Sequence, residues 1–469
     1  MRGEEPRRTT TRHGNRADPG EDEMSIFKAY DIRGVYPDQI DEKIARRVGE
    51  AMVDYLQARR LIVGHDMRTM AESMTDAFVD GVLSRGCDVT DIGLVSTPAV
   101  YCAIGEIACD GGAVITASHN PKEYTGIKMC KAGPVPLSGD EGIPEIKALA
   151  EGSEPTPAPT RGKREPFDIK PIYLDKLIEL TGGPEAIAPQ KIVVDYANGM
   201  GIWDAPEAFA RFKGLEVIPL YDSLDGTFPN HEANPLREEN LQDLKKAVRE
   251  NGATLGLAFD GDADRCAFVD EEGRTVGADL ITVILARFML ERHPGRCIIY
   301  DLRSSKVLPE KVLEYGGKPV KERVGHAFMK ATMKREGCIG GGELSGHFYF
   351  SEFYNSDSGL LAGLRVLAQL SKEGKTLKQA ADELRIYYQS GEINFRVENK
   401  EEKMEEVVKA FPGGKVERLD GILITFPDWW VNVRPSNTEP YLRLVLEADS
   451  EALLEEKKKE LIQILGTPV

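Results

Sequence analysis

Short apolar runs alternate with longer amphipathic stretches along most of the chain. The short runs are of strand length, whereas the longer stretches repeat their apolar positions at helical spacing. We expect strands at 61–64, 88–92, 112–116, 191–196, 215–220, 254–260, 297–301 and 337–341. We expect helices at 41–58, 70–85, 239–251, 277–292, 358–372 and 376–385. This alternation predicts α/β layers.

The last part of the chain has a different pattern, with several strand-like runs before one final helix. The runs lie at 392–397, 421–426, 429–433 and 441–447, and the helix is expected over 450–465. Ser450 is suited to be the N-cap of this helix, and Gly466 to stop it. The fold class that follows is α/β, with three similar α/β domains with mixed sheets and then a smaller C-terminal α+β domain.

Composition marks the domain boundaries. Residues 1–23 are charged and nearly lack apolar side chains, which predicts a disordered extension. The Pro-rich stretch 151–165 predicts an extended linker, and a turn at 271–273 precedes the third unit. We therefore expect domains over 24–165, 166–272, 273–388 and 389–469.

Charge and cysteine content exclude several classes of protein. The net charge of −17 repels nucleic acid and anionic membranes, so we expect neither as a partner. No apolar stretch approaches the roughly 20 residues needed to cross a bilayer. The 7 cysteines are scattered and odd in number, which is typical of reduced thiols in a cytoplasmic protein. We expect a monomer or a small homo-oligomer.

One serine loop carries the first candidate chemistry. Ser118 lies in T-A-S-H-N-P, directly after an apolar run, and Asn-Pro favours a turn that would present the serine at the edge of a sheet. A serine needs activation to be a nucleophile, but the adjacent His119 is not implied as its partner because sequence neighbours seldom face each other. The alternative is a turn serine that caps a helix. Lys128 favours the interpretation of Ser118 as a nucleophile, since its side chain could exchange a hydroxyl proton or neutralise phosphate.

A second polar loop contains three aspartates. Asp260, Asp262 and Asp264 follow an apolar run and supply the hard oxygen ligands that Mg²⁺ or Ca²⁺ prefers. An EF-hand is excluded because Arg265 stands where that loop needs glycine, and no helices flank it. The alternative is a solvated acidic turn. Three like charges packed together are costly without a cation, which favours the metal site.

Two further loops are suited to bind sugar and phosphate. The glycine-rich segment 340–347 contains Glu343, Ser345 and His347, which could bind sugar hydroxyls. The segment 434–439 places an arginine beside hydroxyl and amide groups, a combination that grips phosphate. Ordinary surface turns are the alternative for both. Arg33 and Arg68 are further cations that could offset the negative exterior at one cleft.

Four motifs stand in one order along the chain: T-A-S-H-N-P, D-G-D-A-D-R, G-G-E-L-S-G-H and R-P-S-N-T-E-P. Together they resemble those of the α-D-phosphohexomutase superfamily, in its phosphomannomutase/phosphoglucomutase branch, from about residue 26 onward. The resemblance implies four domains around a central cleft, of which the last closes over substrate. It implies that Ser118 is carried as phosphoserine and that Asp260, Asp262 and Asp264 hold Mg²⁺ with that phosphate, so that Ser118 is itself a metal ligand.

The resemblance also implies roles for the other residues of the site. Lys128 would be the general acid or base, acting with Ser118, Arg33 and His347 as the catalytic set. The substrate-binding set would be Tyr30, Arg265, Arg303, His326, Glu343, Ser345, Arg434, Ser436, Asn437 and Thr438. Two departures stand out: Arg303 replaces a common lysine, and Ala263 replaces a common glycine. The second is minor if the backbone there is not at positive φ.

The activity implied by the resemblance is reversible phosphoryl transfer between C1 and C6 of mannose or glucose phosphate. It would proceed through hexose 1,6-bisphosphate, which also serves as activator, with Mg²⁺ as cofactor. The opening F-K-A-Y-D-I-R-G and Leu344 favour this branch over phosphoglucosamine mutase. The alternatives are that enzyme, a metal-dependent sugar phosphatase, or a non-catalytic scaffold that binds sugar phosphates. The preference between mannose and glucose stays open.

Overall fold

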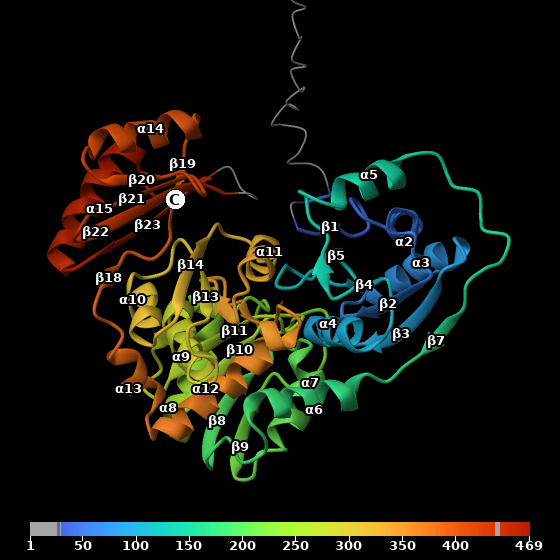
Figure 1. Ribbon diagram of the computed structural model, residues 1–469, viewed down its shortest axis with the longest axis horizontal. Coiled ribbons are helices and arrows are strands. Elements are labelled where there is room, and N and C mark those ends of the chain that lie inside the picture. Colours follow the sequence, from blue (N-terminus) through green and yellow to red (C-terminus); the bar gives the residue numbers. More distant parts are fainter. Residues whose placement is uncertain (1–25, 29, 437–440) are drawn as a thin grey trace, which may run out of the picture.

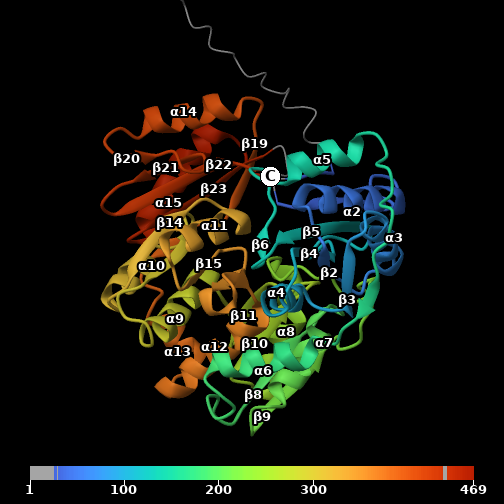
Figure 2. The same ribbon diagram turned by 45° about the vertical axis from the view of Figure 1, so that its right-hand side comes forward.

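The strands of this protein form four separate sheets. The structure is a computed structural model that describes residues 26–28, 30–436 and 441–469. The predicted extension at 1–23 lies outside the described residues. Figure 1 shows four lobes that follow one another in an arc, and Figure 2 shows the same order after a turn. The expected fold class, three α/β domains followed by a smaller α+β domain, is confirmed.

Domain 1 is built on a mixed sheet in the order β1-β5-β4-β2-β3-β7, with β6 paired to β5. Its elements are β1 (Ile32–Val35), α2 (Glu42–Leu56), β2 (Arg60–His65), α3 (Ala71–Ser84), β3 (Asp88–Leu94), α4 (Thr97–Glu106), β4 (Gly111–Ile115), β5 (Tyr124–Lys131), β6 (Val135–Pro136), α5 (Ile143–Glu151) and β7 (Arg164–Pro166). Strand β4 is buried throughout, as its small apolar residues predict, and runs parallel to β2 but antiparallel to β5.

Domain 2 repeats the mixed arrangement in the order β12-β11-β10-β8-β9. Its elements are α6 (Lys170–Thr181), β8 (Gln190–Asp195), α7 (Gly201–Phe209), β9 (Leu215–Leu220), the 3₁₀-helix η1 (Glu238–Leu241), α8 (Gln242–Asn251), β10 (Leu255–Phe259), β11 (Cys266–Asp270) and β12 (Thr275–Val276). Strand β10 is fully buried and leads directly into the aspartate loop, which then turns back into the antiparallel β11.

Domain 3 has a mixed sheet in the order β14-β13-β15-β16-β17. Its elements are α9 (Ala278–Leu290), β13 (Cys297–Asp301), α10 (Val307–Glu314), β14 (Lys318–Glu322), α11 (His326–Glu336), β15 (Gly340–Gly342), β16 (Phe348–Phe350), the 3₁₀-helix η2 (Ser351–Phe353), β17 (Ser356–Asp357), α12 (Gly359–Glu373) and α13 (Leu377–Asp382). The candidate sugar loop connects β15 to β16.

Domain 4 is an antiparallel sheet in the order β18-β23-β22-β21-β20, with β19 also paired to β23. Its elements are β18 (Tyr388–Gln389), β19 (Ile393–Arg396), α14 (Lys400–Ala410), β20 (Lys415–Glu417), β21 (Ile422–Thr425), β22 (Trp429–Pro435), β23 (Tyr441–Ala448) and α15 (Glu451–Leu465). Ser450 caps α15 by accepting a hydrogen bond from the Leu453 backbone, as expected.

The hydrophobic core separates domain 4 from the other three. One continuous cluster joins buried residues of domains 1, 2 and 3, such as Val114, Phe259 and Phe348. Domain 4 has a cluster of its own around Trp429. A small cluster that includes Leu302 and residues of domain 4 connects the two. Domain 4 therefore has a core separate from that of the other three domains.

Several details differ from the sequence predictions. The expected linker 151–165 ends in β7, which pairs with β3, so part of it belongs to the domain 1 sheet. The strand expected at 337–341 lies at Gly340–Gly342, because Gly337 is the left-handed C-cap of α11. Strand β12 pairs with β11, so the domain 2 sheet extends past residue 272, the expected end of that domain.

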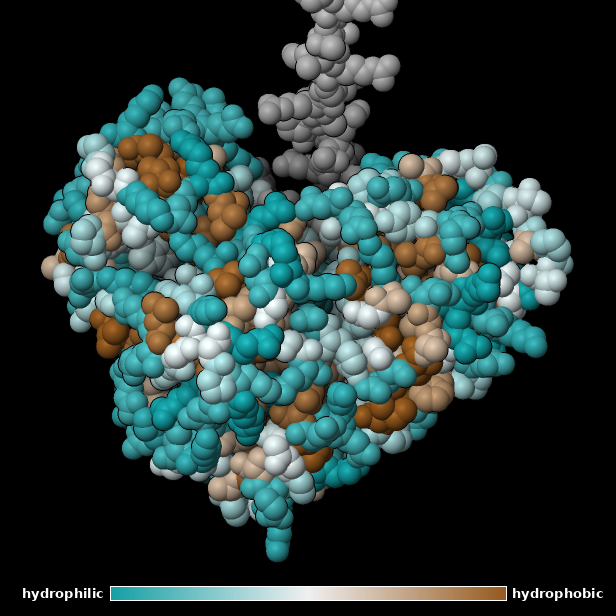
Figure 3. All heavy atoms as spheres, viewed as in Figure 1, coloured by the Kyte–Doolittle hydropathy of each residue, from teal (hydrophilic) through white to brown (hydrophobic). Residues whose placement is uncertain are grey.

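The face of the molecule in Figure 3 is mostly hydrophilic, with scattered apolar residues, as the composition predicts. Its outline is notched between the lobes of domain 1 and domain 4. None of the helices in the described residues combines the length and apolar character needed to cross a bilayer.

Candidate active site

The serine loop begins where β4 ends. Ser118 has a left-handed backbone with φ of 50°, and its N–H donates to the Thr116 hydroxyl at 3.0 Å. A non-glycine residue in this region is strained and persists only where its surroundings hold it. The Ser118 residue is 1% exposed, so it is covered rather than displayed on the surface.

What covers Ser118 is the aspartate loop of domain 2. The Ser118 Oγ donates to Asp260 Oδ2 at 2.7 Å, across the boundary between the two domains. Gly261 permits this approach, because a Cβ at that position would lie 2.4 Å from the Ser118 carbonyl oxygen. Thr97 of α4 fastens the same loop through hydrogen bonds to the backbone and the carboxylate of Asp262. The candidate nucleophile and the candidate metal ligands therefore meet.

The three aspartates form a compact group of oxygen atoms. Asp260, Asp262 and Asp264 are all buried, and each offers one carboxylate oxygen within 4.8 Å of the others. Two of their oxygens, Asp262 Oδ1 and Asp264 Oδ1, have no hydrogen-bond partner among the described residues. Burial and the charges of the other two aspartates raise the pKa of Asp260 well above its usual value. Buried, unpartnered carboxylate oxygens of this kind fit a hard divalent cation such as Mg²⁺.

Lys128 lies against the aspartates from β5. Its Nζ donates to Asp262 Oδ2 at 2.7 Å and to Asp264 Oδ2 at 2.6 Å. Burial alone would lower the pKa of Lys128, but the two carboxylates outweigh it and raise the pKa. In this state the ammonium group therefore neutralises part of the aspartate charge.

His119 corrects one expectation from the sequence. Its Nδ1 lies 3.4 Å from Ser118 Oγ, although residues next to each other in a chain seldom face each other. The backbone at Ser118 is left-handed, so the alternation that separates neighbouring side chains in a regular strand does not hold there. Burial, and then the charges of Arg265 and Arg33, lower the pKa of His119 well below its usual value.

Arg68 corrects a second expectation, because its guanidinium does not face the cleft as a free cation. It donates instead to four backbone carbonyls of the serine loop, those of Ser118, Asn120, Pro121 and Tyr124, at 2.6–3.0 Å. Asp66 lies 3.3 Å from its Nε, and both side chains are buried. Five fixed donors on a planar group suit this task. Arg68 is therefore a positioning residue that holds the strained loop.

We expect Arg68→Lys to lower kcat about 100-fold with little change in KM, because a loop displaced by about 1 Å misplaces the nucleophile. A lysine keeps the charge but cannot reach four carbonyls. Arg68→Ala should also destabilise the fold by about 3–5 kcal/mol, since it leaves Asp66 buried and uncompensated. Steady-state kinetics and thermal unfolding measure both effects, with the exposed Arg59→Lys as control. A rise in KM at constant kcat would show that Arg68 binds substrate instead.

The sugar loop of domain 3 faces domain 1. Glu343 is buried and accepts hydrogen bonds from the Gly325 N–H, at 2.7 Å, and from the Tyr349 hydroxyl. Burial and the charge of Asp301 raise the pKa of Glu343 to about 7. The ring of His326 lies 5.3 Å from that of Tyr30 and 5.9 Å from that of His347, between centroids. Tyr30 also donates to the Val324 carbonyl at 3.2 Å, so domains 1 and 3 touch beside the site.

His347 and two arginines join the sugar loop to the aspartate and serine loops. The His347 Nε2 lies 4.0 Å from Asp264 Oδ1, and burial and the charge of Arg265 lower the pKa of His347 to about 4. Arg265 Nε lies 3.7 Å from Asp260 Oδ2. Arg33 donates to the Asn120 amide oxygen at 2.6 Å and pairs with Asp31. Ser345 is half-buried in the same loop.

The remaining candidate residues form a second group. Arg303 is paired with Asp301, which also accepts from the Leu344 N–H at 2.8 Å and so ties Arg303 to the sugar loop. Arg434 lies on β22 with its Nη2 3.0 Å from Glu392 Oε2. Ser436 is buried beyond the end of that strand. Asn437 and Thr438 lie outside the described residues.

The replacement of a common glycine by Ala263 is not minor, because the condition stated for it, a backbone that is not at positive φ, is not met. Its backbone has φ of 62°, in the left-handed region that favours glycine. Alanine there costs roughly 1–2 kcal/mol relative to an unstrained residue. The buried aspartate loop therefore stores strain of its own beside that of the serine loop.

Sequence reasoning missed a buried ion pair behind His347. Asp357 of β17 lies 2.8 Å from the Lys330 Nζ and 3.7 Å from the His347 Nδ1. Neither residue stands in a loop of distinctive composition, so the chain carried no signal of their proximity. They add one more opposite-charge pair to the wall of the site.

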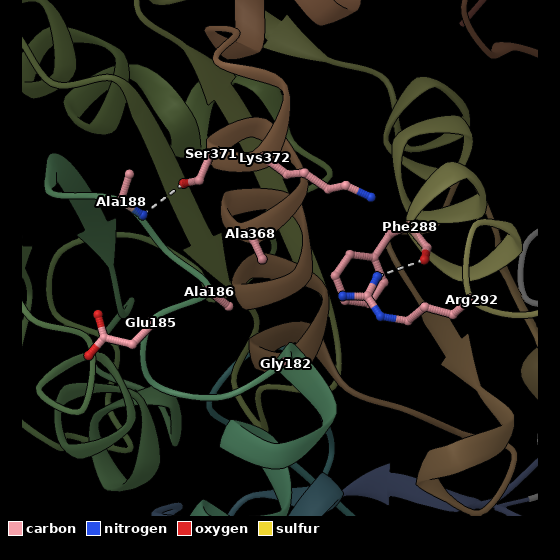
Figure 4. Close-up of a pocket in the computed structure, with 9 residues that line it drawn as sticks. All are labelled: Gly182, Glu185, Ala186, Ala188, Phe288, Arg292, Ala368, Ser371 and Lys372. Carbon is pink, nitrogen blue, oxygen red and sulfur yellow. Dashed lines mark hydrogen bonds between the residues drawn. The ribbon is translucent and has the colours of Figure 1, made fainter.

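A separate cavity of about 390 Å³ lies between domains 2 and 3 and contains none of the predicted site residues. Figure 4 shows Arg292 folded over the Phe288 ring and donating to the Phe288 carbonyl, and the Ala188 N–H donating to Ser371. These hydrogen bonds join groups of the protein to one another.

Comparison with known proteins places the whole described chain in one family. Models of four domains match in order: phosphoglucomutase/phosphomannomutase alpha/beta/alpha domains I, II and III at residues 24–156, 171–273 and 278–387, and the C-terminal domain at 392–464. A phosphomannomutase of Salmonella montevideo is 38% identical over 95% of this chain and 99% of its own length. One from Methanocaldococcus jannaschii is also 38% identical, over 95% and 98%.

A solved structure has the same fold over nearly the whole chain. The phosphoglucomutase/phosphomannomutase family protein of Burkholderia thailandensis superposes with a TM-score of 0.87 at 32% sequence identity. The match covers 94% of this chain and 97% of that one.

Proposed function

The chain belongs to the phosphoglucomutase/phosphomannomutase family and is a hexose phosphate mutase, and we propose that it carries the phosphoryl group on Ser118. The observation that carries this proposal is the 2.7 Å hydrogen bond between Ser118 Oγ and Asp260 Oδ2. It brings a serine hydroxyl to a group of three buried carboxylates, as phosphoryl transfer with a divalent cation requires.

The proposed reaction begins with phosphorylated Ser118. The bond between Ser118 Oγ and phosphorus breaks as the free hydroxyl of a hexose monophosphate forms a bond to the same phosphorus. The sugar hydroxyl gives its proton to a proton-transfer residue of the site, and the released Ser118 Oγ takes up a proton. The resulting hexose 1,6-bisphosphate then reorients within the cleft, so that its other phosphoryl group faces Ser118. Ser118 Oγ then takes the other phosphoryl group, and the isomeric monophosphate leaves. The same bisphosphate serves as activator, because it can phosphorylate a serine that has lost its group.

The residues around Ser118 support this sequence of steps. Asp260, Asp262 and Asp264 would hold Mg²⁺, which when bound neutralises charge on the transferring group. Arg33 and Arg265 add positive charge at the same place. Lys128 and His347 are the proposed proton-transfer residues. Because Lys128 is paired with two aspartates, it can exchange a proton with substrate only once those contacts loosen.

Substrate would lie between the serine loop and domain 4. Glu343 and Ser345 would bind sugar hydroxyls, with Tyr30 and His326 beside them. Arg303, Arg434, Ser436, Asn437 and Thr438 would hold the phosphate that does not react. Closure of domain 4 would exclude water, which otherwise hydrolyses the phosphoserine. The free cysteines, of which all but Cys109 are buried, are consistent with the proposed cytoplasmic location.

Coupled assays on mannose, glucose and glucosamine phosphates test the proposal. We expect conversion between the 1- and 6-phosphates of mannose or glucose, with release of inorganic phosphate far slower than isomerisation. Faster phosphate release would identify a phosphatase, and preference for the amino sugar would identify a phosphoglucosamine mutase. Binding of these sugar phosphates without conversion would identify a non-catalytic scaffold.

A further inference from the structure

Three arginines converge on one carboxylate at the junction of domains 3 and 4. Glu392 lies between β18 and β19, where the chain enters domain 4. Its Oε2 is 3.0 Å from Arg434 Nη2 and 3.6 Å from Arg303 Nη1, and its Oε1 is 3.2 Å from Arg443 Nη1. The three donors come from both domains, since Arg303 follows β13 while Arg434 and Arg443 lie on β22 and β23.

Three guanidinium groups in one place favour an anion between them. Arg434 and Arg443 stand directly opposite each other on neighbouring antiparallel strands, where like charges destabilise a sheet. Arg434 and Arg303 are also nearly buried, with side chains 4% and 8% exposed. Burial, and then the charge of Arg303, lower the pKa of Arg434. Asp301 pairs with Arg303 at 2.7 Å, and the charges of Glu392 and Asp420 partly offset the lowering of the Arg434 pKa.

Glu392 supplies this anion, and its side chain is partly exposed to solvent. It is 31% exposed, far more than Arg303 or Arg434, and its carboxylate carries a single charge. A phosphate monoester carries up to two charges and three acceptor oxygens, so it is the stronger ligand for a set of guanidinium groups. Phosphate can therefore compete with the Glu392 carboxylate for these arginines.

We propose that Glu392 is a specificity-determining residue of the phosphate subsite, where its carboxylate occupies the arginines until the phosphate of the substrate displaces it. This rests on the proposed function, which assigns Arg434 to the non-reacting phosphate. The exchange sets a threshold: a ligand must bind the arginines more strongly than one carboxylate does. Dianionic phosphate esters pass that threshold, whereas neutral sugars and singly charged ligands do not.

Titration of inorganic phosphate into the full chain, without Mg²⁺ and with Ser118 dephosphorylated, tests the exchange directly. We expect Glu392→Gln to bind phosphate about fivefold more tightly than the parent, because it removes a competing, partly exposed ion pair. Glu392→Asp, which keeps the charge on a shorter side chain, should give a smaller gain. The exposed Glu398→Gln removes the same charge nearby and should change nothing. Arg434→Gln should abolish phosphate binding, which would show that the phosphate binds at these arginines.

Weaker phosphate binding by Glu392→Gln would overturn the proposal, because it would show that the carboxylate orients the arginines instead of competing for them. Equal binding by parent and Glu392→Gln would overturn it as well. The difference should shrink as ionic strength rises, as for any partly exposed charge pair. If the parent isomerises no hexose phosphate, the proposed function fails, yet this titration still decides the role of Glu392.

Discussion

Ser118→Ala will lower the rate of hexose phosphate isomerisation by at least about 10⁴-fold, because it removes the one protein atom proposed to form a bond with phosphorus. No other hydroxyl among the described residues contacts Asp260 in the way that Ser118 Oγ does at 2.7 Å. Coupled assays of parent and variant, each supplied with hexose 1,6-bisphosphate and Mg²⁺, measure the effect.

Two controls separate lost chemistry from lost structure. The Ser118 hydroxyl donates to the buried Asp260, so alanine should cost about 1–3 kcal/mol and leave a folded variant with a modestly lower thermal unfolding midpoint. Ser73→Ala, an exposed serine of α3, should keep full activity. Equal activity of Ser118→Ala and parent would remove Ser118 from the mechanism.

Asp262→Asn will lower kcat/KM by about 10²- to 10³-fold and raise the Mg²⁺ concentration needed for half-maximal activity. The substitution keeps the shape of the side chain but removes one negative charge from the proposed metal site. Asp262 Oδ1 has no hydrogen-bond partner among the described residues, whereas Oδ2 accepts from both Lys128 and Thr97. An amide has one acceptor oxygen instead of two, so it cannot bind a cation and also accept hydrogen bonds from Lys128 and Thr97 equally well.

Activity measured across a series of Mg²⁺ concentrations, after removal of metal with a chelator, tests this prediction. Excess Mg²⁺ should restore part of the activity of Asp262→Asn, and the chelated parent should be inactive until metal returns. Asp222→Asn removes an exposed charge from the same domain and should behave like the parent. An unchanged metal requirement in Asp262→Asn would contradict the assignment of the aspartates.

The position of both reacting loops could be predicted because each follows a buried strand. Strands β4 and β10 consist of glycine and apolar residues, and polar residues directly after such strands lie at the edge of a sheet, where ligands bind. Helices such as α2, α3, α9, α12 and α15 were predicted for a similar reason, since apolar periodicity and capping residues are local signals, whereas α4, α6, α7 and α11 were not among the predicted helices. The motif order then identified the family from the sequence alone.

Strand β5, which carries Lys128, was not among the predicted strands. Its sequence Y-T-G-I-K-M-C-K mixes a buried lysine with apolar residues, because one of its residues faces the aspartates instead of a hydrophobic layer. A charged residue inside a strand obscures the alternation on which the prediction depends. The residue is buried only because another domain supplies two carboxylates.

The interactions of Arg68 and Glu392 could not be predicted because they depend on distant parts of the chain. Arg68 lies 50 or more residues before the carbonyls that it binds, and Glu392 lies 42 residues before Arg434. Neither has a local pattern that distinguishes it from a surface charge. The left-handed backbone at Ser118 and Ala263 is likewise a property of the folded loops, which tertiary contacts hold in place.

The central claim is that Ser118 exchanges its phosphoryl group with the sugar during turnover. Incubation of the enzyme with hexose 1,6-bisphosphate labelled in its phosphoryl groups, followed by proteolysis and mass spectrometry of the peptide containing Ser118, measures this exchange. The account predicts labelled phosphoserine at residue 118, appearing at least as fast as isomerisation. Rapid isomerisation with no label on that peptide would contradict it.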